Sequence, residues 1–126
     1  MAASRPVIAV IEADASDRRS LCSLLSTLDV DVQVFDSAES YLATAHDSPG
    51  CLISEVALPG MSGLELLRRL RSANGAPPMI LLGEESDVRA AVTAMQEGAM
   101  DFLEKPHVNL AILRRVAHLL DGGVRH

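Results

Sequence analysis

The sequence predicts an α/β protein in which five parallel strands form one sheet covered by helices on both faces. Short runs rich in aliphatic and β-branched residues alternate five times with longer stretches of helical apolar spacing. Most of the short runs are apolar throughout, which is typical of parallel strands buried on both faces. Such an alternation predicts right-handed crossovers and a doubly wound sheet.

Each element can be placed from its apolar pattern. The strands are expected at Val7–Ile11 and at residues 30–35, 51–54, 79–82 and 102–103. Between the strands, apolar side chains recur at the three- and four-residue intervals of a helix. These helical patterns cover residues 21–28, 38–45, 64–70, 88–95 and 113–120.

Local signals indicate where helices begin and end. Asp36 followed by Glu39 predicts a capping box at the second helix, and Asn109 is expected to cap the last helix. Gly75 and Gly98 stand where two helices are expected to end.

Length and composition restrict the class of protein. The chain has 126 residues, a net charge of −6 and 48% hydrophobic residues, which favours one globular domain with a poor affinity for nucleic acid. We expect a short arm at residues 1–5, the domain at 6–120, and the start of a linker or an appended end at 121–126. There is no run long enough to span a membrane. Cys22 and Cys51 are expected to be free thiols in the cytoplasm.

Charged residues follow the expected strands at the edge where functional groups collect in an open α/β sheet. Glu12 follows the first strand, Glu55 the third, Gly83 the fourth, and Lys105 with Pro106 the fifth. We therefore expect acidic side chains from two central strands to face one lysine.

Two long motifs resemble those of response-regulator receiver domains of two-component signalling. They are residues 58–67, LPGMSGLELL, and residues 91–106, AVTAMQEGAMDFLEKP. The resemblance covers nearly all of residues 6–120 and is strongest to receivers fused to helix-turn-helix output domains. It implies a three-layer (βα)5, CheY-like and flavodoxin-like fold with strand order 2-1-3-4-5.

The resemblance also implies phosphoryl transfer from a kinase histidine to an aspartate at the end of the third strand. Glu12 and Lys105 match family positions that help to hold Mg²⁺ and the phosphoryl oxygens. Phe102 matches an aromatic residue that rotates on activation. The peptide bond before Pro106 is implied to be cis, which would direct the lysine into the site.

Three positions depart from the family pattern. Glu55 stands at the phosphoacceptor position, and its extra methylene displaces the carboxylate that in-line transfer must align. Ala13 replaces the second acid and offers no oxygen to Mg²⁺; Asp14 next to it points differently. The hydroxyl position after the fourth strand is Gly83, or Leu82 if one residue is inserted.

These departures predict a degenerate pocket without a metal or cofactor. The vestigial metal ligands would be Glu12, Glu55 and the carbonyl of Ala57. The two glutamates and Lys105 give the pocket a net charge of −1, so the lysine neutralises much of the carboxylate charge and the loss of the metal becomes tolerable. We expect Glu55 to reach toward Lys105 and to hold a fixed arrangement.

The leading hypothesis is therefore a non-enzymatic signalling module that works through protein–protein contacts. Residues 87–120 are the face that family members use for dimers and partners. The resemblance further implies a sensor histidine kinase upstream, and DNA contact only through an output domain outside these residues. Glu55 would imitate the phosphorylated state in part, or hold the inactive one. The alternatives are a working phosphoacceptor with an altered Mg²⁺ site, and a small flavodoxin-like ligand-binding domain or enzyme.

Overall fold

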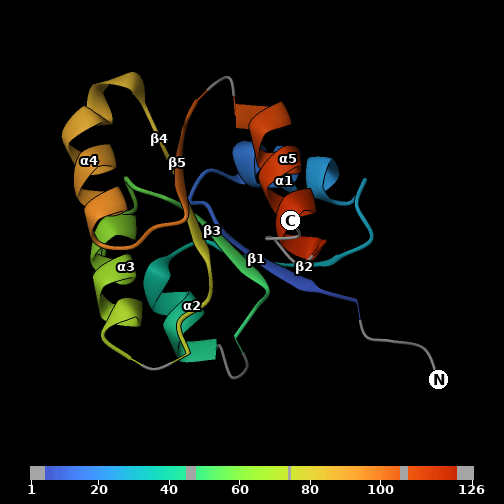
Figure 1. Ribbon diagram of the computed structural model, residues 1–126, viewed down its shortest axis with the longest axis horizontal. Helices are drawn as coiled ribbons and strands as arrows, with labels where there is room; N and C mark the ends of the chain where they lie inside the picture. The colour runs from blue at the N-terminus through green and yellow to red at the C-terminus, as the bar shows by residue number, and fades with distance from the viewer. Residues whose placement is uncertain (1–4, 45–47, 74, 106–107, 122–126) are drawn as a thin grey trace.

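The five strands form a single parallel sheet. The computed structural model describes residues 5–44, 48–73, 75–105 and 108–121. Within them the strand order is β2-β1-β3-β4-β5, as predicted (Figure 1). The strands are β1 (Val7–Ile11), β2 (Asp31–Phe35), β3 (Cys51–Glu55), β4 (Met79–Gly83) and β5 (Asp101–Glu104).

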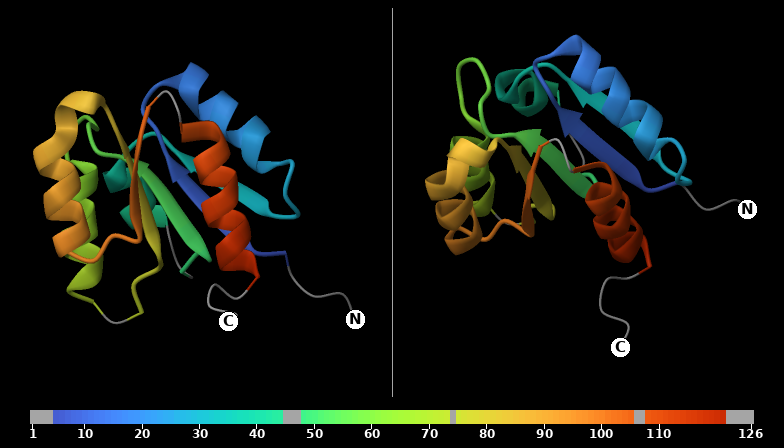
Figure 2. Two further views of the ribbon diagram at one scale, coloured as in Figure 1. Left: turned by 45° about the horizontal axis from the view of Figure 1, so that its top comes forward. Right: turned by 90° about the horizontal axis from the view of Figure 1, so that it is seen from above.

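Helices cover both faces of the sheet, which confirms the predicted three layers. The helices are α1 (Ala15–Leu25), α2 (Ala38–Thr44), α3 (Gly63–Arg71), α4 (Val88–Gln96) and α5 (Val108–Leu120). Helices α1 and α5 lie on one face, and α2, α3 and α4 lie on the other (Figure 2). One 3₁₀ turn, η1 (Glu85–Asp87), was not predicted and leads from β4 into α4.

The hydrophobic core has two halves, one on each side of the sheet. Successive side chains of a strand point to opposite faces. Thus Ile8 and Val10 of β1 pack with α1 and α5, whereas Ala9 and Ile11 pack with α2, α3 and α4. Because both halves are apolar, the central strands read as continuous hydrophobic runs in the sequence.

The start of α2 differs from the predicted capping box. The helix begins at Ala38, and the Ser40 N–H donates to Ser37 Oγ over 3.0 Å, so the cap is Ser37 and not Asp36. The Glu39 carboxylate accepts instead from the Met61 N–H over 2.8 Å. Glu39 therefore ties α2 to the loop between β3 and α3 rather than closing its own helix.

The other predicted helix ends are correct only in part. Helix α5 begins at Val108, so Asn109 lies inside the first turn and the cap predicted there is wrong. Gly98 follows α4 with a positive φ of 101° and ends that helix as expected. Gly75 also has a positive φ, but it lies four residues beyond Arg71, where α3 ends.

Helix α4 turns most of its large apolar side chains toward solvent. Val88, Val92 and Met95 are 65%, 54% and 48% exposed, and only Ala94 of this helix is fully buried. Ala94 packs in the core between α4 and the sheet, whereas the larger apolar side chains of the helix lie on its outer side. We call Val88, Val92 and Met95 the α4 outer face.

Two further predictions concern residues away from the sheet edge. Cys22 and Cys51 are both free, as expected, and burial raises the pKa of the Cys51 thiol to about 12. In the part of the chain that the structure describes, every helix is too short or too polar to cross a membrane.

Candidate functional site at the carboxyl edge of the sheet

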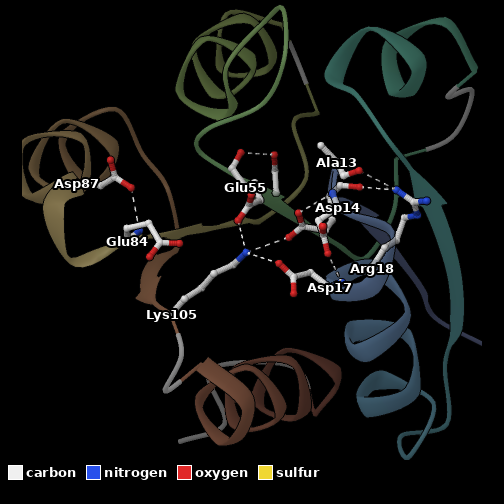
Figure 3. A network of polar contacts seen from close by, with 10 residues as sticks. Ala13, Asp14, Asp17, Arg18, Glu55, Glu84, Asp87 and Lys105 are labelled. Atoms are coloured by element: carbon white, nitrogen blue, oxygen red, sulfur yellow. Dashed lines mark hydrogen bonds and ion pairs between the residues drawn. The ribbon is translucent and has the colours of Figure 1, made fainter.

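Three strand ends bring the predicted charged residues together. Glu12 directly follows β1, Glu55 is the last residue of β3, and Lys105 directly follows β5. The Glu12 N–H donates to the Phe35 carbonyl over 3.0 Å, and the Lys105 N–H donates to the Gly83 carbonyl over 2.8 Å. Both backbones are thus held by neighbouring strands, and their side chains meet at one edge of the sheet, where Lys105 also points toward Glu55 (Figure 3).

Lys105 lies between the two predicted glutamates. Its Nζ is 3.2 Å from Glu12 Oε1 and forms a closer ion pair with Glu55 Oε2. The Glu12 side chain is 1% exposed, Glu55 15% and Lys105 18%. Burying charges this deeply is costly unless they are paired, and here the two acids pair with the lysine. The predicted reach of Glu55 toward Lys105 is therefore present.

A third carboxylate, Asp17, was missed in the sequence. Asp17 Oδ2 lies 3.2 Å from Lys105 Nζ and comes from the first turn of α1. The cluster formed by Glu12, Asp17, Glu55 and Lys105, called the rim cluster below, has three negative charges and one positive charge. Its net charge is −2, and the predicted value of −1 was wrong because it left out Asp17. The available signal was the spacing of three residues between Asp14 and Asp17, which places Asp17 in the first turn of a helix capped by Asp14.

Burial and pairing act in opposite directions on the two central groups. Burial raises the pKa of the Glu55 carboxyl, the hydrogen bond from Lys105 lowers it, and nearby Glu12 raises it again, for a net upward shift. Burial lowers the pKa of Lys105, but its pairs with Glu55 and Glu12 outweigh this effect and hold it above the ordinary value. Lys105 is therefore a permanent cation at neutral pH.

The loop after β1 uses its oxygens within the protein. Glu12 Oε2 accepts from the Asp14 N–H over 3.1 Å, while Oε1 faces Lys105. Arg18 Nη1 donates to the carbonyls of Glu12 and Ala13 over 2.8 and 3.4 Å. The Ala13 side chain supplies no oxygen, and Ala57 lies exposed in the loop after β3.

This donor set does not fit Mg²⁺, which requires near-octahedral oxygens. Both Glu12 oxygens are engaged, Ala13 contributes none, and the Lys105 ammonium stands between the remaining carboxylates. Over residues 5–44, 48–73, 75–105 and 108–121, no three His, Cys, Asp or Glu side chains are arranged to hold a metal ion.

The family position that carries a hydroxyl side chain after β4 is Gly83 here, and the ring of Phe102 lies beside it. Gly83 ends β4, and a Cβ built on it would lie 2.4 Å from Phe102 Cζ and 3.0 Å from Asp87 Oδ2. The ring of Phe102 therefore uses the space that any side chain at position 83 would need. Leu82 is 1% exposed and belongs to the core on the α1 and α5 side, so of the two residues only Gly83 contacts the ring.

Pro106 lies outside the described residues, so the cis peptide implied there stays a prediction. Of the four histidines, only His118 lies in the described part of the chain. It lies in α5 and is exposed.

Known proteins resemble this chain over most of its length. Residues 8–117 match the family described as the response regulator receiver domain. The transcriptional regulatory protein FixJ of Bradyrhizobium diazoefficiens is 43% identical over 100 residues, which are 79% of this chain and 49% of that protein. The nodulation protein W of the same organism is 37% identical over 116 residues, 91% of this chain and 51% of that protein. The chain thus spans about half the length of these curated relatives.

Solved structures share the fold. Full-length FixJ from B. japonicum superposes with a TM-score of 0.85 at 32% identity, covering 96% of this chain and 60% of that one. A response regulator receiver protein from Pseudoalteromonas atlantica also gives 0.85, at 34% identity, covering 94% of this chain and 100% of that one.

Proposed function

This chain belongs to the response regulator receiver domain family of two-component signalling, and we propose that it is a receiver that does not accept a phosphoryl group at Glu55 and acts through contacts with other proteins. Receiver domains of response regulators are generally not enzymes in their own right. They typically pair with sensor histidine kinases and, in relatives such as the DNA-binding transcriptional regulator NtrC of Escherichia coli, are joined to longer chains.

The ion pair between Glu55 and Lys105 carries the proposal. A nucleophile for in-line transfer must present a free oxygen about 3–3.5 Å from the phosphorus. The longer glutamate instead directs Oε2 onto Lys105, the group that would otherwise bind the phosphoryl oxygens. Nucleophile and electrophilic partner thus neutralise each other. A phosphoryl group would bring about two negative charges, whereas Glu55 brings one.

Two further features support the proposal. Ala13 stands where a metal ligand is expected, and the remaining oxygens do not suit Mg²⁺. Without a bound cation, a negatively charged phosphodonor would approach a cluster of net charge −2 and be repelled. Gly83 removes the hydroxyl, and the Phe102 ring already lies where such a side chain would stand. We infer that the family's chemistry is absent here while its fold is retained.

The surface available to a partner is the α4 outer face. Its three large apolar side chains are about half exposed or more, and Leu110 at the start of α5 is 58% exposed. These residues lie within the predicted partner surface, residues 87–120. We propose that this surface binds a second copy of the chain or another signalling protein, and that any DNA contact belongs to an output domain outside the described fold.

The proposal can be tested by incubating the protein with Mg²⁺ and a small-molecule phosphodonor and measuring its intact mass. We expect no phosphoryl adduct on the natural chain. The variant Glu55→Asp with Ala13→Asp restores two ligands without disturbing Gly83, and we expect it to gain one phosphoryl group. An adduct on Glu55 of the natural chain would instead identify a working phosphoacceptor with an altered metal site.

Adding Gly83→Thr to that variant is not advisable in the first experiment. The threonine would supply the missing hydroxyl, but its Cβ would collide with the Phe102 ring. A failure to accept phosphate could then arise from displaced packing and not from the chemistry of Glu55.

A further inference from the structure

The ammonium of Lys105 has as many carboxylate partners as it has N–H bonds. A lysine ammonium donates three hydrogen bonds and accepts none. In this structure its Nζ faces Glu12 Oε1, Asp17 Oδ2 and Glu55 Oε2. All three donors are therefore used inside the protein, and an anion arriving from solvent finds no free N–H on this residue.

Asp17 differs from the other two partners. Glu12 and Glu55 follow central strands and are 1% and 15% exposed, whereas Asp17 belongs to α1 and its side chain is 54% exposed. Its ion pair with Lys105 is open to water and salt, so it is the weakest of the three and the one that an entering anion would meet first.

The position of Asp17 is set by a closed circuit of hydrogen bonds. The Asp17 N–H donates to Asp14 Oδ2 over 2.8 Å, and the Asp14 N–H donates to Glu12 Oε2 over 3.1 Å. Lys105 then joins Asp17 to Glu12 by donating to both. The Asp14 cap thus holds the first turn of α1, from which the Asp17 carboxylate reaches Lys105 (Figure 3).

We propose that Asp17 is an autoinhibitory contact that keeps small anions away from Lys105 by occupying the outward N–H of its ammonium group. This rests on the proposed function, since it supplies the reason that the pocket rejects phosphoryl oxygens from the solvent side. Removing the Asp17 charge weakens the hold on one N–H of Lys105 and lowers the negative charge of the rim cluster from −2 to −1. Both changes favour the approach of an oxyanion.

The chain contains a single lysine, which makes a direct test feasible. Labelling the lysine side chain with ¹⁵N gives one ammonium signal, and inorganic phosphate serves as the probe. We expect the signal of the natural protein to stay fixed during a phosphate titration. In Asp17→Asn, which keeps the size of the side chain, we expect it to shift with an affinity about tenfold higher than any seen in the natural protein.

Asp36→Asn is the matched control, because Asp36 is exposed, follows β2 and loses the same charge. We expect this variant to behave as the natural protein does. Equal shifts in the natural protein and Asp17→Asn, or no shift in either, would overturn the proposal. The titration contains no phosphodonor, so its failure leaves the mass measurement on Glu55 to decide the proposed function separately.

Discussion

The rim cluster and the α4 outer face both reverse the usual distribution of side chains, but in opposite ways. The rim cluster places three of its four charges inside the protein, where Glu12, Glu55 and Lys105 are 1%, 15% and 18% exposed, and each of the four charges has a partner. The α4 outer face places large apolar groups outside, 48% to 65% exposed. Buried charges are retained when they are paired, and exposed apolar groups gain stability only when something covers them. The first region is thus complete within one chain, whereas the second gains from a partner.

The largest effect is expected from Lys105→Met, which leaves the rim cluster with three carboxylates and no cation. Breaking a buried pair by removing one partner typically costs about 3–5 kcal/mol, and we expect a loss in this range at neutral pH by chemical denaturation. The loss should shrink at acidic pH, because the pKa of Glu55 is already raised and the carboxyl then takes up a proton.

Arg115→Met provides the control for that measurement. Arg115 pairs with Asp101, but the two side chains are 40% and 25% exposed, so the expected loss is about 1 kcal/mol. Equal losses in the two variants would mean that the rim cluster is no more coupled than an ordinary surface pair.

The next effect is expected from Gly83→Thr, which tests the packing beside the rim cluster. Its Cβ would lie 2.4 Å from Phe102 Cζ, so the ring must move. Overpacking of this kind typically costs about 1–3 kcal/mol. The chain has only two phenylalanines, so the shift of the Phe102 ring signals can be followed by NMR.

Gly50→Ala is the matched control, because its nearest contact would be an ordinary 3.5 Å from the Val7 carbonyl oxygen. We expect its stability to change by no more than about 0.5 kcal/mol. A Gly83→Thr protein with an unmoved Phe102 ring would show that position 83 and the ring do not share one space.

A smaller effect on stability is expected when the α4 outer face is made polar. Replacing Val88 and Val92 by Ser and Met95 by Gln removes exposed apolar groups, so each change should alter stability by no more than about 0.5 kcal/mol. Self-association or partner binding, measured by analytical ultracentrifugation, should weaken instead. Gln96→Ser on the same helix is the control, and equal association in both variants would contradict the assignment of this surface.

The smallest effect concerns Glu39, which ties α2 to the loop that follows β3. The Met61 N–H holds the pKa of Glu39 below its ordinary value of 4.5. A lowered carboxyl pKa contributes stability above the ordinary pKa, and that stability is lost as the pH falls through the folded value. Glu39→Gln should therefore show a shallower loss of stability below about pH 4.5 than the natural protein. Identical acid profiles would show that the contact with Met61 is absent in solution.

Much of this fold could be predicted because the signals are local and repeated. Short runs rich in aliphatic and β-branched residues identified all five strands, and the motifs around Pro59 and Lys105 gave the strand order through the family resemblance. The errors lie where local signals compete. Ser37 and Asp36 are both good helix caps, and only the backbone geometry decides between them. In α4 the helical period was correct, but the period alone does not say which face meets the sheet.

The candidate site, like the fold, could be predicted where it depends on the strand ends and could not be predicted where it depends on packing. Glu12, Glu55 and Lys105 could be placed because parallel strands end at one edge of a sheet. Asp17 could not be placed in the same way, since its approach to Lys105 depends on the angle at which α1 leaves β1. The fit of the Phe102 ring against Gly83 depends likewise on packing between two strands, for which the sequence has no periodic signal.

The central claim is that Lys105 pairs with Glu12 and Glu55 and so prevents these carboxylates from binding a metal ion or accepting a phosphoryl group. A crystal structure grown with Mg²⁺ in excess tests this most directly. We predict that Lys105 Nζ remains between Glu12 and Glu55 and that no ion is bound beside them. A well-ordered divalent ion coordinated by Glu12, Glu55 and the carbonyl of Ala57, with Lys105 displaced, would contradict the account.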